Sequence, residues 1–275
     1  MKPRLGTAKT AEALQQAMAA LQGRRADEAQ RIAAGVLARE PRHPRALHML
    51  GLALLSLGRP REAVPPLEQA AGLVADPVIE THCGIALRQS GQSARALELL
   101  QRAAARQPPF ALAFHELGVL LFSLRRLDEA QAVLERGLAH APAMAELSVL
   151  LGGIFLDRLD WSNAKLAFAR ALANSPGQPA ALFGLGAALM GEGEFAPAAE
   201  RFRHALARDP SYTRARLQLA TCLFELDRRD EAVTCLRTAV QAVPQCYGEA
   251  VRTLVSAGRG RFPLKPSAAA AMLRQ

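Results

Sequence analysis

The chain repeats itself with a period of 33 or 34 residues, and this internal repeat constrains its fold more than any other feature. In each unit, a small residue is followed three positions later by a large apolar one. The six pairs are Gly51 and Leu54, Gly84 and Leu87, Gly118 and Leu121, Gly152 and Phe155, Gly186 and Leu189, and Ala220 and Leu223. A period of this length indicates an array in which one small structural unit is stacked many times.

A second set of positions repeats in step with the first, later in each unit. An alanine is followed four positions later by a large apolar residue, and three positions after that by another small residue. The alanines are Ala63, Ala96, Ala130, Ala164, Ala198 and Ala232. Offsets of three and four place side chains on one face of a helix, so each unit is expected to hold two amphipathic helices. Prolines such as Pro108 and Pro142 close most units, because proline disfavours helical geometry in the residue before it.

The composition agrees with a helical chain that buries a large core. Half of the residues are hydrophobic, 50%, which excludes wholesale disorder. No apolar run reaches the roughly 18 residues that span a bilayer. Gln15 and Gln16 interrupt the apolar N-terminal segment, so we expect no export signal and a cytoplasmic location. The four cysteines lack C-x-x-C spacing and are expected to be reduced structural thiols.

The two repeating sets together resemble the tetratricopeptide repeat, a 34-residue helix–turn–helix module. The resemblance covers residues 44–244 in six clear copies, and a weaker seventh copy lies at 10–43, where Ala29 and Pro41 fit the pattern. It implies an all-α fold: a right-handed α-solenoid of about seven tetratricopeptide-type helical hairpins with a C-terminal capping helix. Pro65 and Pro66 stand early in one second helix, where we expect a local irregularity rather than a break.

The repeat also predicts how the chain is divided. We expect an N-terminal arm at 1–9 and a solenoid at 10–244, with units near 10–43, 44–76, 77–110, 111–144, 145–178, 179–212 and 213–246. A stripe of Tyr247, Val251, Leu254 and Val255 predicts a capping helix at 247–258. Residues 259–275 are expected to form a basic tail with a short helix from about Ser267.

Family resemblance also points to a binding site. In tetratricopeptide-repeat proteins the first helices of successive repeats line a concave groove that receives partner peptides. The corresponding apolar positions here are Leu52, Leu55, Ile85, Val119, Phe122, Val149, Leu156, Phe183, Met190, Leu217 and Phe224. Two interpretations stay open. These side chains either pack against neighbouring helices in a tight superhelix, or form an apolar groove for an apolar or amphipathic segment of another protein.

Two groove chemistries known in the family do not fit this sequence. One clamps a C-terminal carboxylate with Lys, Arg and Asn, and the other grips peptide backbone with a ladder of asparagines. The chain has only two asparagines, Asn163 and Asn174, and neither stands at a groove position. Recognition through apolar side chains is the chemistry that remains.

Sequence motifs for catalysis or metal binding are lacking. There is no Gly-rich phosphate loop, no G-x-S-x-G and no H-E-x-x-H, so we expect no enzyme and no small-molecule substrate. His48, His82 and His115 fall at similar places in three successive units. No cysteine or carboxylate completes a ligand set with established spacing, so we expect no metal and no cofactor.

The leading hypothesis is therefore a bacterial, cytoplasmic scaffold or adaptor with a chaperone-like character and a protein or peptide partner. Self-association through the apolar positions or the solenoid ends is compatible with it. The formal net charge of +9 supports an alternative, a basic solenoid that binds nucleic acid or an anionic membrane surface. In a third hypothesis the tail folds back and its apolar residues plug the groove; these are Phe262, Leu264, Met272 and Leu273.

Overall fold

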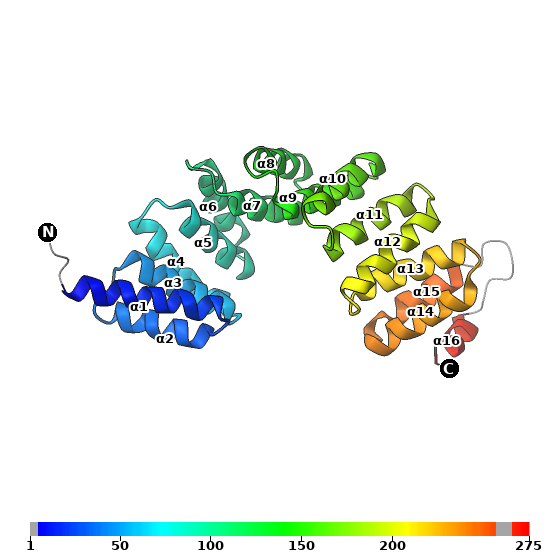
Figure 1. Cartoon of the computed structure of the whole chain (residues 1–275), viewed down its shortest axis with the longest axis horizontal. Helices are drawn as coiled ribbons and strands as arrows, with labels where there is room; N and C mark the ends of the chain where they lie inside the picture. The colour runs from blue at the N-terminus through cyan, green and yellow to red at the C-terminus, as the bar shows by residue number, and fades with distance from the viewer. Residues whose placement is uncertain (1–4, 257–265, 275) are drawn as a thin grey trace. The chain divides into compact units, whose positions relative to one another are not determined.

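The computed structural model describes residues 5–256 and 266–274. Within these residues the structure is all helical and contains no strand, as the repeat predicts. None of the helices found there is long and apolar enough to cross a membrane. The chain divides into two compact units, Met1–Ala141 and Pro142–Gln275 (Figure 1).

The first unit holds four consecutive helical hairpins, drawn from blue to green in Figure 1. Its helices are α1 (Leu5–Gln22), α2 (Ala26–Leu37), α3 (Pro44–Ser56), α4 (Pro60–Leu73), α5 (Pro77–Gln89), α6 (Ser93–Ala105), α7 (Ala111–Ser123) and α8 (Leu127–His140). Helix α1 begins at Leu5, inside the segment expected to be an arm. Helix α4 runs through Pro65 and Pro66 without the break that the sequence led us to exclude, and the local irregularity expected there stays a prediction.

The second unit holds three more hairpins and the C-terminal helices. Its elements are α9 (Ala145–Asp157), α10 (Trp161–Asn174), α11 (Pro179–Gly191), α12 (Phe195–Arg208), α13 (Thr213–Glu225), α14 (Arg229–Ala242), the 3-10 helix η1 (Pro244–Cys246), α15 (Tyr247–Ser256) and α16 (Pro266–Arg274). Helix α15 packs on α13 and α14, and its Ala250 and Leu254 are buried. It is the capping helix that the stripe from Tyr247 to Val255 predicts.

Within each unit, every helix packs against the next one, and the first helices of successive hairpins also touch. In the first unit α1 contacts α3, α3 contacts α5, and α5 contacts α7. In the second unit α9 contacts α11, and α11 contacts α13. This pattern of stacked hairpins confirms the tetratricopeptide-type architecture.

In four hairpins, the glycine of the first helix makes room for the large residue of the second helix; the pairs are Gly51 and Leu67, Gly84 and Leu100, Gly152 and Phe168, and Gly186 and Phe202. A Cβ atom added to Gly84 would lie 2.5 Å from Cγ of Leu100, and one added to Gly152 would lie 2.7 Å from Cζ of Phe168. Both large side chains are buried. These paired residues therefore close the core of their hairpins. Apolar residues at some other positions of the first helices are not needed to close it.

Turns inside the hairpins require one residue in the left-handed region of backbone conformation. Glycine supplies it at Gly58, Gly91 and Gly193. The other four hairpins place Arg24, Arg125, Leu159 and Asp227 there, with φ between 56° and 61°. The same left-handed turn geometry therefore recurs in hairpins that have no glycine at this position.

Candidate functional site

The first unit presents five of the predicted groove residues on one face of its first helices. Leu52 and Leu55 lie on α3, Ile85 on α5, and Val119 and Phe122 on α7; all five are half-buried. We call these five residues the first-helix face of the first unit. Other apolar residues of the same three helices, such as Leu54, Leu87 and Leu121, are buried. The face therefore keeps apolar surface open to solvent beside a core that is already closed.

A pair of histidines accompanies this face. Nε2 of His48 on α3 and Nδ1 of His82 on α5 lie 3.0 Å apart and share a hydrogen bond. Burial, and then the charge of His82, lower the pKa of His48 to about 4. Burial also lowers the pKa of His82. Both imidazoles are therefore neutral at neutral pH, and the pair adds no charge to the face.

An internal ion pair links α5 and α7 near the same face. Arg88 Nη2 donates to Glu116 Oε2 at 2.9 Å, and His115 Nδ1 lies 3.3 Å from Glu116 Oε1. Burial raises the pKa of Glu116, but the hydrogen bonds from His115 and Arg88 outweigh it, so the pKa is lowered overall. The carboxylate is ionised and already has its partners. A ligand on this face would thus meet mainly apolar side chains.

The second unit carries the other six predicted groove residues on α9, α11 and α13. Val149, Leu156, Met190 and Phe224 are half-buried, and we call these four the first-helix face of the second unit. Phe183 and Leu217, in contrast, are only 8% and 3% exposed. The ring of Phe183 packs against Phe202 and Tyr212, with ring centroids 5.6 and 5.2 Å away. Phe183 and Leu217 therefore belong largely to the core of this unit and have little surface for a partner.

Two of the four residues proposed as a tail plug, Phe262 and Leu264, lie outside the described residues. The other two, Met272 and Leu273, lie on α16, which among the described helices contacts α14 and α15. Arg237 Nε donates to the carbonyl oxygen of Met272 at 2.7 Å, and Leu273 is buried. These two residues sit against the C-terminal helices rather than along α9 or α11.

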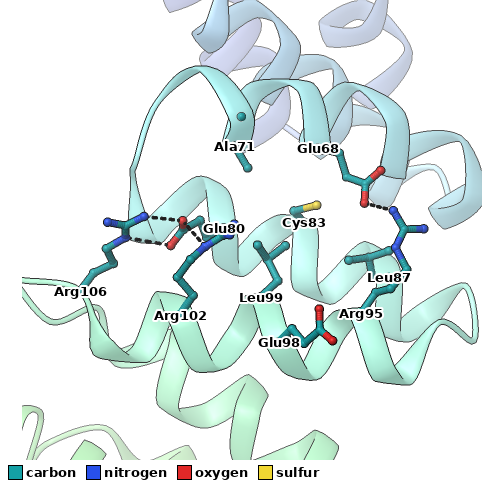
Figure 2. A pocket seen from close by; sticks show the side chains of 11 residues that line it. Glu68, Ala71, Glu80, Cys83, Leu87, Arg95, Glu98, Leu99, Arg102 and Arg106 are labelled. Atoms are coloured by element: carbon teal, nitrogen blue, oxygen red, sulfur yellow. Dashed lines mark hydrogen bonds and ion pairs between the residues drawn. The ribbon is translucent and has the colours of Figure 1, made fainter.

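The structure also reveals a charged cluster that the sequence does not make obvious. Glu80 of α5 has a side chain only 1% exposed, and it accepts a hydrogen bond from Arg102 Nε at 2.8 Å and from Arg106 Nη2 at 2.9 Å. Figure 2 shows Arg102 of α6 and Arg106, which directly follows α6, reaching to the carboxylate. A cavity of about 380 Å³ between α4, α5 and α6 adjoins the cluster. The signal in the sequence is a single glutamate at a repeat position that is otherwise occupied by Leu47, Phe114, Ser148, Leu182 and Arg216.

The four cysteines are free thiols, and burial raises the pKa of each one. Cys83 and Cys222 are buried, and burial raises the pKa of each to about 12. A thiol with such a pKa stays protonated and is a poor nucleophile. Within the described residues, no three His, Cys, Asp or Glu side chains are grouped so that they could hold a metal ion.

Sequence comparison assigns the family. Two models described as tetratricopeptide repeat match the chain, one at residues 14–77 and 150–196 and the other at 87–151 and 189–257. The chain belongs to the tetratricopeptide-repeat family. Proteins with this fold are protein-interaction scaffolds, and the family is typically not enzymatic. Among curated proteins, none has a sequence that matches this chain significantly.

Solved structures with the same fold are distant in sequence. A chain of the APC/C hetero-tetramer Cut9–Hcn1 matches with a TM-score of 0.70 and 16% identity, over 83% of this chain and 45% of that one. The human IFIT1 dimer with PPP-AAAA matches with a TM-score of 0.68 and 15% identity, over 92% of this chain and 65% of that one. PilF of Pseudomonas aeruginosa matches with a TM-score of 0.66 and 20% identity, over 73% and 92%. This chain thus spans less than two thirds of the first two proteins, and the likeness shows the fold alone.

Proposed function

We propose that this tetratricopeptide-repeat protein is a scaffold or adaptor, chaperone-like in character, that binds an apolar or amphipathic segment of a partner protein on its first-helix faces. The observation that carries the proposal is the row of half-buried apolar side chains on contacting first helices. Fully burying such a side chain contributes about 1.5–3 kcal/mol. Because these residues are half-buried already, each would contribute a fraction of that, and several must act together.

The spacing of the row suits an amphipathic helix. Packed helices lie about 8–10 Å apart, so α3, α5 and α7 present their apolar residues at steps of about that length. Residues i and i+7 of a helix lie about 10 Å apart along its axis, at 1.5 Å per residue. A helical segment of about three to four turns crossing α3, α5 and α7 would therefore meet an anchor at each step.

The polar groups near the first unit's face support an apolar ligand rather than a charged one. Glu116 is already paired with Arg88, and the histidine pair is neutral at neutral pH. A charged ligand would have to compete with these internal contacts. An apolar segment would leave them intact and would bury only the side chains between them.

Site-specific photo-crosslinking in cells tests the proposal. A photoreactive phenylalanine analogue at Phe122 is expected to form a discrete adduct with a partner protein. The matched control carries the analogue at Leu166, an apolar residue of α10 that is 68% exposed. If both positions give the same adducts, or neither gives any, the face around Phe122 is no binding site.

A charge substitution separates a binding face from a core position. Phe122→Glu is expected to abolish capture of the cross-linked partner and to leave the helical circular dichroism unchanged, with Leu166→Glu as the control. Loss of helical signal would mean that Phe122 is part of the core, and the proposal would then fail. Phe183 is unsuitable for this test, because its burial makes any loss of binding ambiguous.

The alternative function, binding of nucleic acid or an anionic membrane surface, draws on the net charge of +9. Salt distinguishes the two. Raising salt from about 50 to about 200 mM weakens phosphate-driven binding by about 10³–10⁵-fold when 6–10 phosphates are contacted. Apolar capture at Phe122 should barely change. A steep salt dependence would favour the alternative, and a cytoplasmic location, which the free thiols suit, is compatible with either function.

A further inference from the structure

The hairpins from α5 to α12 can be compared at three equivalent positions: one residue of the first helix, and the residues 22 and 26 positions later, which lie near the C-terminal end of the second helix or directly after it. We call these three positions the notch of a hairpin. In α5 and α6 these residues are Glu80, Arg102 and Arg106. The carboxylate of Glu80 lies between the two guanidinium groups and accepts hydrogen bonds from both (Figure 2). This notch thus binds a carboxylate that the chain itself provides.

The same notch in α7 and α8 is filled differently. Its residues are Phe114, Arg136 and His140. The guanidinium carbon of Arg136 lies 5.6 Å from the centroid of the Phe114 ring, and the His140 ring also lies 5.6 Å from it. A cation over an aromatic face is an attractive contact. Here the aromatic ring of Phe114 contacts both basic side chains of the notch.

In α9 and α10 the notch has only one basic position. Its residues are Ser148, Arg170 and Asn174. Asn174 Nδ2 donates to the carbonyl oxygens of Pro142 and Arg170, at 3.2 and 3.1 Å. An amide occupied by backbone carbonyls does not attract an anion, so this notch is not comparable with that of Glu80.

The notch of α11 and α12 has basic residues but neither a carboxylate nor an aromatic ring to pair with them. Leu182 takes the position of Glu80, while His204 and Arg208 take the positions of Arg102 and Arg106. Arg201, one helical turn before His204, adds a third basic side chain to the lining of a cavity of about 470 Å³. Across the part of the chain that the structure describes, no ion pair or hydrogen bond joins the side chains of Arg201, His204 and Arg208 to another group.

The lining of this cavity defines the chemistry of its ligand. The remaining lining residues are Leu172, Pro176, Leu182 and Ala207, so the floor is apolar and no carboxylate is present. The cavity of Glu80, in contrast, is lined by three glutamates as well as three arginines. A ligand for the α11–α12 notch must therefore bring a negative charge and an apolar group together.

We propose that the notch of α11 and α12 binds a glutamate or aspartate side chain of a partner polypeptide, flanked by an apolar residue that covers Leu172 and Leu182. Glu80 between Arg102 and Arg106 is the internal model for this contact, because it places a carboxylate at the equivalent position. Charge-assisted hydrogen bonds to arginine give the contact both strength and direction. The notch shares no residue with either first-helix face, so this docking point goes beyond the function proposed above.

Nuclear magnetic resonance of the full chain tests the proposal with a defined probe. The probe is an N-acetylated, C-amidated peptide of sequence Ala-Leu-Glu-Leu-Ala, and its control carries Gln in place of Glu. The Glu peptide is expected to shift the backbone amides around Arg201, His204 and Arg208 in a saturable way. The Gln peptide should bind about ten-fold more weakly or worse, because it lacks the charge-assisted hydrogen bonds.

Two substitutions locate the contact. Arg208→Gln is expected to weaken binding of the Glu peptide about ten-fold, whereas Arg252→Gln, which removes the same charge from the exposed surface of α15, should leave it unchanged. Leu182→Glu supplies an internal carboxylate, as in the notch of Glu80, and should abolish binding. If Leu182→Glu does not fold, the comparison of Arg208→Gln with Arg252→Gln still decides the matter.

The reciprocal substitution is the sharpest test. Glu80→Leu removes the carboxylate between Arg102 and Arg106 and puts leucine there, as Leu182 stands in the α11–α12 notch, so it should create a second set of saturable shifts around Arg102 and Arg106. Equal binding of the Glu and Gln peptides would overturn the proposal. So would shifts around Arg208 with inorganic phosphate but none with the Glu peptide, because the notch would then be a phosphate site. Neither result would affect the crosslinking test at Phe122.

Discussion

At the scale of single residues, packing requires glycine at particular positions of the first helices, such as Gly152 and Gly184. The ring of Phe168 on α10 lies against Gly152 of its own hairpin and against Gly184 of the next one, and a Cβ atom at either glycine would overlap it. We expect Gly184→Ala to destabilise the protein by about 1–3 kcal/mol, the range for overpacking a well-filled core. Urea unfolding of the full chain, followed by circular dichroism, measures this.

Gly153, the neighbour of Gly152, is the matched control. It is also within α9, but a Cβ atom added there would meet nothing within 4 Å. Gly153→Ala should therefore stabilise the protein by about 0.5–1 kcal/mol, because alanine has the higher helix propensity. If both substitutions raised the urea midpoint, helix propensity would explain both and the packing argument at Gly184 would be wrong.

The His48–His82 pair makes stability depend on pH. The pKa of His48 falls from 6.5 to about 4 on folding, through burial and the charge of His82, with Asp76 opposing and Arg45 adding to the shift. Below pH 6.5 the unfolded chain therefore binds a proton that the folded chain does not, so stability is lost as pH falls toward 4. Relative to a His48→Leu variant, the natural chain should lose about 2 kcal/mol more between about pH 7.5 and about pH 5.

Urea unfolding at the two pH values checks this expectation, because both proteins share every other titrating group. An equal loss of stability in the two chains would show that His48 is protonated in the folded state.

At the scale of helices, α16 is held by a small number of contacts. Leu273 is 6% exposed within the core cluster of the second unit, and Arg237 donates to the backbone of Met272. Leu273→Ala should destabilise the second unit by about 2–5 kcal/mol if the site cannot collapse. Ala271→Ser, on the exposed side of the same helix, should have little effect. Thermal melts of both variants test this, and equal melting points would mean that α16 does not dock through Leu273.

At the scale of the whole molecule, each unit consists of complete hairpins with its own buried clusters. Stacked repeats are stabilised by contacts between nearest neighbours, so a fragment of whole hairpins retains most of its contacts. We expect a fragment of residues 1–141 to be helical and to unfold cooperatively in urea. A fragment of residues 1–125 leaves α7 without α8 and should be less stable.

The two fragments provide their own comparison. If 1–141 and 1–125 unfold at the same urea concentration, α8 contributes nothing to the first unit. That result would be at odds with the complete burial of Leu134, the large apolar residue of α8.

Much of the architecture follows from the sequence by itself, because the pairs of small and large residues act within one hairpin or between successive ones. Gly84 and Leu100, or Gly152 and Phe168, stand at fixed offsets, so a repeat in the sequence translates directly into a repeat in space. The helices, the capping helix and the family could all be predicted from these offsets. The glycine turns could be predicted as well, but Arg24 and Leu159 show that the turn geometry also forms with residues that give no such signal.

Only the tertiary structure decided which of the apolar repeat positions are exposed and which charged side chains have a partner of opposite charge. Phe122 and Phe183 look alike in the sequence, but Phe183 packs against Phe202 and Tyr212 from other elements and is lost to the core. Likewise, Glu80 and Leu182 stand at equivalent repeat positions. Glu80 pairs with two arginines, whereas Leu182 lines a cavity whose basic side chains have no carboxylate beside them. The physical reason is that burial and pairing depend on side chains from neighbouring helices, whereas a periodic pattern reports only on the helix that carries it.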